Sequence, residues 1–107
     1  MKVIVSKLWE VLVPVADNNG VKFSVEHHQE WDKVVRATAG GQTIMPTAKG
    51  YWLDPEGILY SDRVIPVRIM CDEPAIRQIG ELTLSHYGQL AVTAYLISDR
   101  AFIFEAE

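Results

Sequence analysis

The sequence predicts an α+β fold in which an antiparallel sheet carries two helices on one of its faces. Two segments place apolar residues three and four positions apart, which is the spacing of an amphipathic helix. The segments before, between and after them carry strand-like apolar patterns, and a turn sequence separates two of these strands. Helices that lie together on one face of such a sheet bury both apolar stripes. We therefore expect the order strand, helix, strand, strand, helix, strand.

The first strand is expected from Val5 to Ala16, a segment rich in Val, Leu and Trp. Because successive side chains of a strand point to opposite faces, Trp9, Val11 and Val13 share one face. Glu10 lies on the other face, in the middle of this apolar segment.

The first helix is expected over residues 24–39. Ser24 offers a hydroxyl that can cap the helix N-terminus, and Glu26 places negative charge in the first turn. Trp31 belongs to the apolar stripe. Gly40, followed by a second glycine, supplies the left-handed residue that commonly ends a helix.

A hairpin is expected around Asp54–Gly57, because Asp, Pro and Gly stand at the first, second and fourth positions of a type I turn. Strand segments at 43–45 and 50–53 precede this turn, and Ile58–Tyr60 follows it. A second long strand is expected over Val64–Cys71. Pro66 cannot donate a ladder hydrogen bond, which predicts a bulge or the edge of the sheet at that point.

The second helix is expected to begin after Asp72, a plausible N-cap, and to end at Gly88. Leu90–Ile97 is expected to form the last strand. Ser98–Arg100 is expected to break that strand, and Ala101–Phe104 to extend it.

With right-handed crossovers, this order of elements is the split βαβ, or ferredoxin-like, arrangement. The length of 107 residues fits a single domain spanning 1–107. The other face of the sheet then stays open. It needs a cover, because the core cannot hold all of the large side chains Trp52, Tyr60, Met70 and Tyr95. We expect a homodimer through this sheet face, for which a dimeric α+β barrel is one known form.

The composition, with 49% hydrophobic and 22% charged residues, is that of a globular protein. The net charge is -4 and the basic residues are scattered, so no nucleic-acid partner is expected. No apolar stretch reaches the ~18 residues of a membrane span. Lys7 and Glu10 interrupt the apolar start of the chain before any signal-peptide pattern develops. With a single Cys71, the chain fits a reducing compartment, and a cytoplasmic location is expected.

His27 and His28 are the most visible candidate metal ligands. Zinc sites on a helix use His residues four positions apart, because those side chains share a face. Adjacent side chains on a helix point about 100° apart, so His86 or Cys71 would have to be brought in by the fold. We therefore expect no metal and no cofactor, with His28 packed under the first helix and His27 in solvent.

Glu10 has two interpretations. A half-buried carboxylate costs several kcal/mol of free energy unless it is paired or protonated. It can form a cross-strand ion pair with Arg68 on the open face. It can instead be a carboxylate with a raised pKa that lines a pocket.

Aromatic and polar side chains near the ends of the strands and helices are candidate ligand-binding residues. They are Trp52, Arg63, Arg68, Tyr87, Gln89 and Tyr95. No nucleophile elbow, phosphate-binding loop or dinucleotide fingerprint occurs. The first hypothesis is therefore a small ligand- or protein-binding domain. The alternative is a small cofactor-free enzyme that resembles dimeric α+β barrel monooxygenases and isomerases, with Glu10 or His28 as the general base.

Short motifs occur at residues 41–44 (Gly-Gln-Thr-Ile), 50–52 (Gly-Tyr-Trp), 62–63 (Asp-Arg) and 87–92 (Tyr-Gly-Gln-Leu-Ala-Val). They resemble the G-x-T…G-x-W, acidic-Arg and Y-x-Q-x-x-V patterns of a family of small bacterial proteins of unknown function. The resemblance covers residues 31–92.

This resemblance implies a ferredoxin-like domain with no established activity. The positions that match its motifs are Trp52, Arg63, Tyr87 and Gln89. Two segments depart from the family's pattern. Residues 11–14 (Val-Leu-Val-Pro) stand where the family has an aromatic-Gly pair, and the Glu-His-His run at 26–28 has no counterpart in it.

Overall fold

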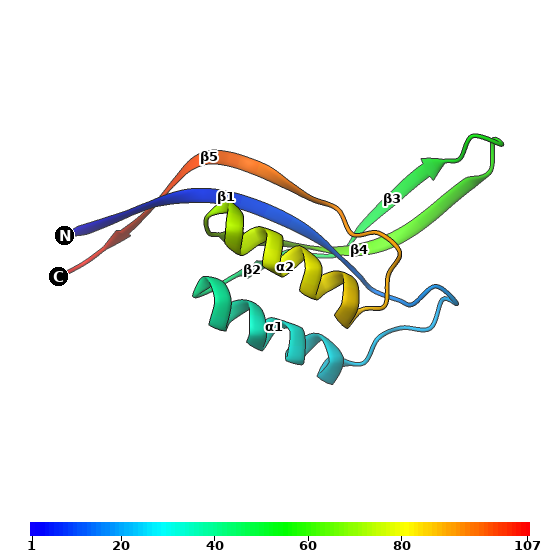
Figure 1. The fold of residues 1–107 in the computed structure, drawn as a ribbon, viewed down its shortest axis with the longest axis horizontal. Helices are drawn as coiled ribbons and strands as arrows, with labels where there is room; N and C mark the ends of the chain where they lie inside the picture. Colours follow the sequence, from blue (N-terminus) through cyan, green and yellow to red (C-terminus); the bar gives the residue numbers. More distant parts are fainter.

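The computed structural model describes all residues, 1–107, and every strand pair in it is antiparallel. The elements are β1 (Lys2–Pro14), α1 (Val25–Ala39), β2 (Thr43–Ile44), β3 (Ala48–Leu53), β4 (Leu59–Met70), α2 (Glu73–His86) and β5 (Ala94–Glu105). The sheet order is β2-β4-β1-β5, and β3 pairs with β4 beyond β2. Both helices lie on one face of the sheet, and the other face is open (Figure 1). The predicted ferredoxin-like α+β class is confirmed.

The core lies between the helices and the side chains of β1 and β4 that face them. Its buried apolar residues are Val11, Val13, Trp31, Val35, Val67, Ile69, Cys71, Ile76, Ile79 and Tyr87. The alternation predicted for the first strand is confirmed, since Val11 and Val13 are buried and Trp9 packs against them. The helices therefore use one face of β1, and Glu10 is left on the other.

Both helices begin at the residues that the capping pattern predicts. The Ser24 hydroxyl accepts a hydrogen bond from the backbone N–H of His27 at the start of α1. The Asp72 carboxylate accepts one from the N–H of Ala75 at the start of α2. Gly40 ends α1 with a φ of 88°, in the left-handed region that favours glycine.

The predicted hairpin is confirmed, because the N–H of Gly57 donates to the carbonyl of Asp54 at 3.0 Å. The two segments expected after this turn, Ile58–Tyr60 and Val64–Cys71, merge into the single strand β4, which leaves out only Ile58 and Cys71 at their outer ends. The turn therefore joins β3 to β4, one of the two 12-residue neighbours of β1.

The expectation that Pro66 marks a bulge or the sheet edge is wrong. β4 is an interior strand, with β1 on one side and β2 and β3 on the other. Pro66 lies opposite the gap between Ile44, where β2 ends, and Ala48, where β3 begins. Its carbonyl accepts the N–H of Met45 across this gap at 2.9 Å. A residue without an N–H is tolerated inside the sheet because the neighbouring ladder is interrupted there.

The last strand begins later than predicted and has no break. β5 starts at Ala94, whereas Leu90 lies outside the strand and is 95% exposed. Ser98–Arg100, expected to interrupt the strand, lies within it. The register of β5 against β1 shifts on both sides of Leu8 instead. A β-bulge takes up an extra residue and bends a strand without ending it.

The molecule is elongated, with principal extents of 54 × 30 × 24 Å. One end is formed by the two chain termini on β1 and β5, and the other by the β3–β4 hairpin, which both project past the helices (Figure 1). The radius of gyration is 15.3 Å, against about 13 Å for a compact domain of this length. Long strand arms therefore extend beyond the part of the sheet that the helices cover.

One side-chain hydrogen bond joins the two helices inside the core. The indole N–H of Trp31 on α1 donates to the Thr83 hydroxyl on α2 at 2.9 Å, and that hydroxyl donates to the carbonyl of Ile79. Trp31 is 1% exposed and Thr83 is 0% exposed. Water cannot replace the acceptor at this depth, so the bond fixes how the two helices pack.

We predict that Thr83→Val lowers the free energy of unfolding by about 1–3 kcal/mol, because the buried indole N–H loses its acceptor while the side-chain volume is kept. Urea denaturation followed by circular dichroism measures the change. Thr38→Val is the matched control, because its exposed hydroxyl bonds only a carbonyl of its own helix. An equal loss in both variants would contradict the prediction.

Candidate functional site

The polar residues of the open face meet at one level of the sheet. The ladder register places Arg68 of β4 and Tyr95 of β5 on either side of Glu10 of β1. The Arg68 Nε–H donates to Glu10 Oε1 at 3.1 Å, and the Tyr95 hydroxyl donates to Oε2. Glu10 is only 7% exposed although no helix covers it. Its predicted ion pair with Arg68 is present.

The neighbours of Glu10 decide its protonation. The hydrogen bond from Tyr95 holds the pKa of Glu10 below its usual value, burial acts in the opposite direction, and Arg68 lowers it further. The same bond raises the pKa of Tyr95. The interpretation of Glu10 as a carboxylate with a raised pKa is therefore wrong, because both of its oxygens accept hydrogen bonds that favour the ionised form.

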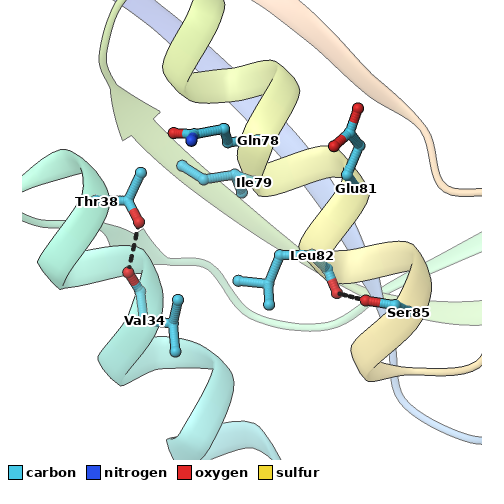
Figure 2. A pocket seen from close by; sticks show the side chains of 7 residues that line it. All are labelled: Val34, Thr38, Gln78, Ile79, Glu81, Leu82 and Ser85. Atoms are coloured by element: carbon cyan, nitrogen blue, oxygen red, sulfur yellow. Dashed lines mark hydrogen bonds between the residues drawn. The ribbon is translucent and has the colours of Figure 1, made fainter.

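Two concavities lie on the helix side of the sheet. A groove of about 350 Å³ runs between the helices, where Val34 and Thr38 of α1 face Leu82 and Ser85 of α2 (Figure 2). A small cavity of about 60 Å³ lies beneath α1 and includes His28 among its lining residues. Glu10 lines neither of them, so its carboxylate, although buried, does not face either of these cavities.

A second cluster forms where the start of α1 meets the end of α2. Tyr87 is 3% exposed and its hydroxyl hydrogen-bonds His28 Nδ1 at 2.7 Å. Burial raises the pKa of Tyr87 and lowers the pKa of His28, which favours the neutral form of both groups. The expectation that His27 is solvated is wrong, because its ring stacks on those of Phe23 and His86.

The predicted ligand-binding residues are distributed over three places. Arg68 and Tyr95 meet Glu10 on the open face, as described above. Gln89 donates its side-chain amide to the carbonyl of Tyr87 at 3.1 Å, beside the second cluster. Trp52 stacks on Tyr60 in the β3–β4 hairpin at a centroid distance of 4.4 Å, and the exposed Arg63 lies in β4 opposite Lys49.

The remaining candidate metal ligand of the sequence, Cys71, is buried and has no reactive character. Burial raises the pKa of its thiol to about 11, so the thiolate is scarce at neutral pH. His86 is the residue whose place the sequence did not reveal. It lies against His27, although 59 positions separate the two, and no short spacing signals such a contact.

No protein-family model and no curated protein matches the chain. Solved structures do match it in fold. A phage SAM lyase in complex with S-methyl-5'-thioadenosine has a TM-score of 0.66 at 12% identity, covering 94% of this chain and 90% of the lyase. CutA1 from Oryza sativa has a TM-score of 0.62 at 14% identity, covering 97% and 84%.

The periplasmic divalent cation tolerance protein CutA from Archaeoglobus fulgidus has a TM-score of 0.61 at 10% identity, covering 88% of this chain and 82% of that one. Identities this low establish the shared fold alone. In the present chain, neither helix is long and apolar enough to cross a membrane.

We predict that Glu10→Gln destabilises the fold by about 1–3 kcal/mol at neutral pH, because Arg68 and Tyr95 lose a charged acceptor. The folded pKa of Glu10 lies below its unfolded value of about 4.3. Its contribution is therefore present above that value and is lost as the pH falls through the folded pKa.

The free-energy difference between wild type and Glu10→Gln should consequently be smaller at pH 2.5 than at pH 7, as measured by urea denaturation. Glu81→Gln, on the exposed side of α2, serves as the control. The same difference at both pH values would show that the charge of Glu10 is not what stabilises the cluster.

Proposed function

We propose that this chain is a small binding domain that works as a homodimer, with a second copy covering the open face of the sheet. The observation that carries the proposal is the amount of surface left exposed. The accessible area is 7299 Å², whereas a compact monomer of this mass exposes about 6,000 Å². The excess is about 1,300 Å², and a standard interface needs about 800 Å² from each partner.

The side chains of the open face supply the apolar part of this surface. Trp52, Tyr60 and Tyr95 are 53%, 41% and 40% exposed, and Ile103 is 42% exposed. The ladder register places all four on the same face as Glu10. Both helices already lie against the opposite face, so no element of the chain itself covers them. Aromatic side chains of this kind are enriched at interfaces.

The polar cluster suits a covered surface. Glu10 and Arg68 neutralise each other, and Tyr95 occupies the second carboxylate oxygen. A partner can therefore lie over the cluster without leaving an unpaired charge, which would be costly. The Arg68 side chain keeps 41% of its surface exposed. Its remaining N–H groups are the donors through which a partner or a small-molecule ligand would be held.

The enzyme alternative has less support from the geometry. A general base must be free to take a proton, whereas both oxygens of Glu10 already accept hydrogen bonds. The bond to Tyr87 occupies Nδ1 of His28, which leaves Nε2 as the one ring nitrogen that an enzyme could use as a base. The ligands in the names of the matched structures belong to proteins at most 14% identical to this chain, so neither a ligand nor a role is taken from them.

The finer predictions of the sequence remain part of this proposal. They are a single domain over residues 1–107, a cytoplasmic location, and membership of the small bacterial family whose motifs residues 41–44, 50–52 and 87–92 resemble. The proposed assembly is the dimeric α+β barrel type, in which two open faces lie against each other.

We predict that light scattering gives a mass of about 24 kDa at micromolar concentration, twice the 12.0 kDa of one chain. Tyr60→Glu should shift the mass toward that of the monomer, because it places a charge in the apolar part of the open face. Val34→Glu is the matched control, because Val34 is 45% exposed but lies on α1, on the other side of the sheet.

A monomeric wild type at 100 micromolar would refute the homodimer. Dissociation by Val34→Glu, with Tyr60→Glu unaffected, would refute the assignment of the interface to the open face. Circular dichroism spectra of both variants establish that a change of mass is not a loss of fold.

A further inference from the structure

The start of α1 and the end of α2 bring two histidine rings into contact. His27 lies in the first turn of α1 and His86 in the last turn of α2. Their ring centroids are 4.0 Å apart, with 26° between the ring planes. Both side chains are partly accessible to solvent, so the pair lies at the rim of the helix layer and not in the core.

A reciprocal pair of hydrogen bonds fixes the tautomer of both rings. His27 Nε2 lies 2.7 Å from the carbonyl oxygen of His86, and His86 Nε2 lies 2.7 Å from the carbonyl oxygen of His27. A carbonyl oxygen only accepts, so each Nε2 must carry the proton that it donates. In the neutral ring, the lone pair then belongs to Nδ1. Each ring therefore keeps one nitrogen, Nδ1, available to a ligand.

This is the arrangement that orients histidine ligands in metal sites. A metal-bound imidazole almost always donates its second ring N–H to a carbonyl, a carboxylate or water, which fixes the ring and increases the basicity of the ligating nitrogen. Here the backbone carbonyl of His86 accepts from the His27 ring, and the backbone carbonyl of His27 accepts from the His86 ring. The outer contacts of a two-histidine site thus exist without any further side chain.

Glu30 supplies an oxygen beside the two rings. It follows His27 by three positions on α1, and residues with this spacing share a helix face. One ligand atom each of His27, Glu30 and His86 lie within 4.8 Å of one another. Glu30 is exposed and takes part in no ion pair of the structure. Its negative charge is therefore free to balance a cation.

We propose that His27, Glu30 and His86 bind a divalent transition-metal ion of the zinc type. Two imidazoles and a carboxylate suit zinc, copper or nickel, whereas calcium and magnesium prefer oxygen ligands alone. Bonds of about 2.0–2.2 Å to a tetrahedral ion place its ligand atoms about 3.4 Å apart. An ion also lies in the plane of each imidazole that binds it, so the two rings, whose planes are 26° apart at a centroid distance of 4.0 Å, turn out of their stack on binding. The Glu30 carboxylate then moves toward them by roughly one ångström. The exposed Glu30 side chain has the freedom to make this movement.

Three protein ligands leave the fourth position of a tetrahedral ion open. An open position is typical of sites that bind water or an exogenous ligand, whereas structural zinc sites are closed by four protein ligands. The C-terminal end of α2 carries partial negative charge, which favours a cation beside His86, whereas the N-terminal end of α1 beside His27 has the opposite effect. The site therefore differs from the expectation of no metal: the sequence named His86 as a ligand that the fold would have to bring in, and the fold brings it against His27.

Titration of the metal-free full chain with Zn²⁺ in a calorimeter tests the proposal, with Co²⁺ absorption as the second readout. One equivalent should bind, and Co²⁺ should give the d–d bands of a four-coordinate ion. Glu30→Gln should weaken Zn²⁺ binding by about 10-fold or more, because the anionic ligand is lost. Glu26→Gln, the matched change on an exposed residue of the same helix turn, should leave the affinity unchanged within twofold.

The proposal is overturned if the folded wild type binds no Zn²⁺ at 100 micromolar metal, in which case the ring pair only ties the helix ends together. It is also overturned if Glu26→Gln weakens binding as much as Glu30→Gln does. His86→Ala should abolish binding while circular dichroism shows the native spectrum. Should that variant fail to fold, the comparison of the two glutamate variants decides the question alone.

Discussion

The register of the central strand β1 determines the rest of the structure. Because side chains alternate along a strand, a shift of one residue would exchange its two faces. In the observed register, Val11 and Val13 pack beneath the helices, and Glu10 points to the open side. The bonds of Glu10 to Arg68 and Tyr95 hold β1 against both of its neighbours at this register. A buried charge that is satisfied on one face thus protects the apolar contacts on the other.

The lengths of the helices and strands explain why the exposed surface is unevenly distributed. The two helices cover only the C-terminal parts of β1 and β4, where the buried residues of both strands lie, because the helices are shorter along the sheet than the strands that carry them. The termini of β1 and β5 and the β3–β4 hairpin extend past this covered part. Their apolar side chains, such as Phe102 and Leu53, have no layer of the same chain to pack against. An elongated sheet with one layer of helices leaves surface for a partner.

Local sequence signals predicted the helices and the turn well, because the hydrogen bonds that begin a helix or close a turn join residues close in sequence. Ser24 and Asp72 cap their helices by bonds that reach only three residues, and the Asp54–Gly57 turn closes within four. Pro66 misled the prediction because the interruption that tolerates it is in another strand. Ser98–Arg100 misled it because a bulge against β1 keeps the ladder intact.

The candidate sites show the same difference between contacts that the sequence predicts and contacts that depend on the fold. The pairing of Glu10 with Arg68 was predictable, because only a few strand residues can neutralise a mid-strand carboxylate. The second partner of Glu10, Tyr95, has the largest part in lowering the pKa of Glu10, and the position of Tyr95 depends on the register of β5. The contact between His27 and His86 depends on how two helices that are distant in sequence lie on the sheet. No spacing within the chain encodes that contact.

The two surfaces for which we propose a function lie in different layers, which makes the proposed roles separable. Glu10, Arg68 and Tyr95 lie on the strand face turned away from the helices, whereas His27, Glu30 and His86 belong to the helix layer. A second copy on the open face would therefore leave the histidine cluster accessible. Tyr87 follows His86 directly and fills the core between that cluster and the sheet. Any coupling between dimer formation and metal binding must pass through this packed core. A variant that loses one of these two properties would therefore not lose the other for that reason alone.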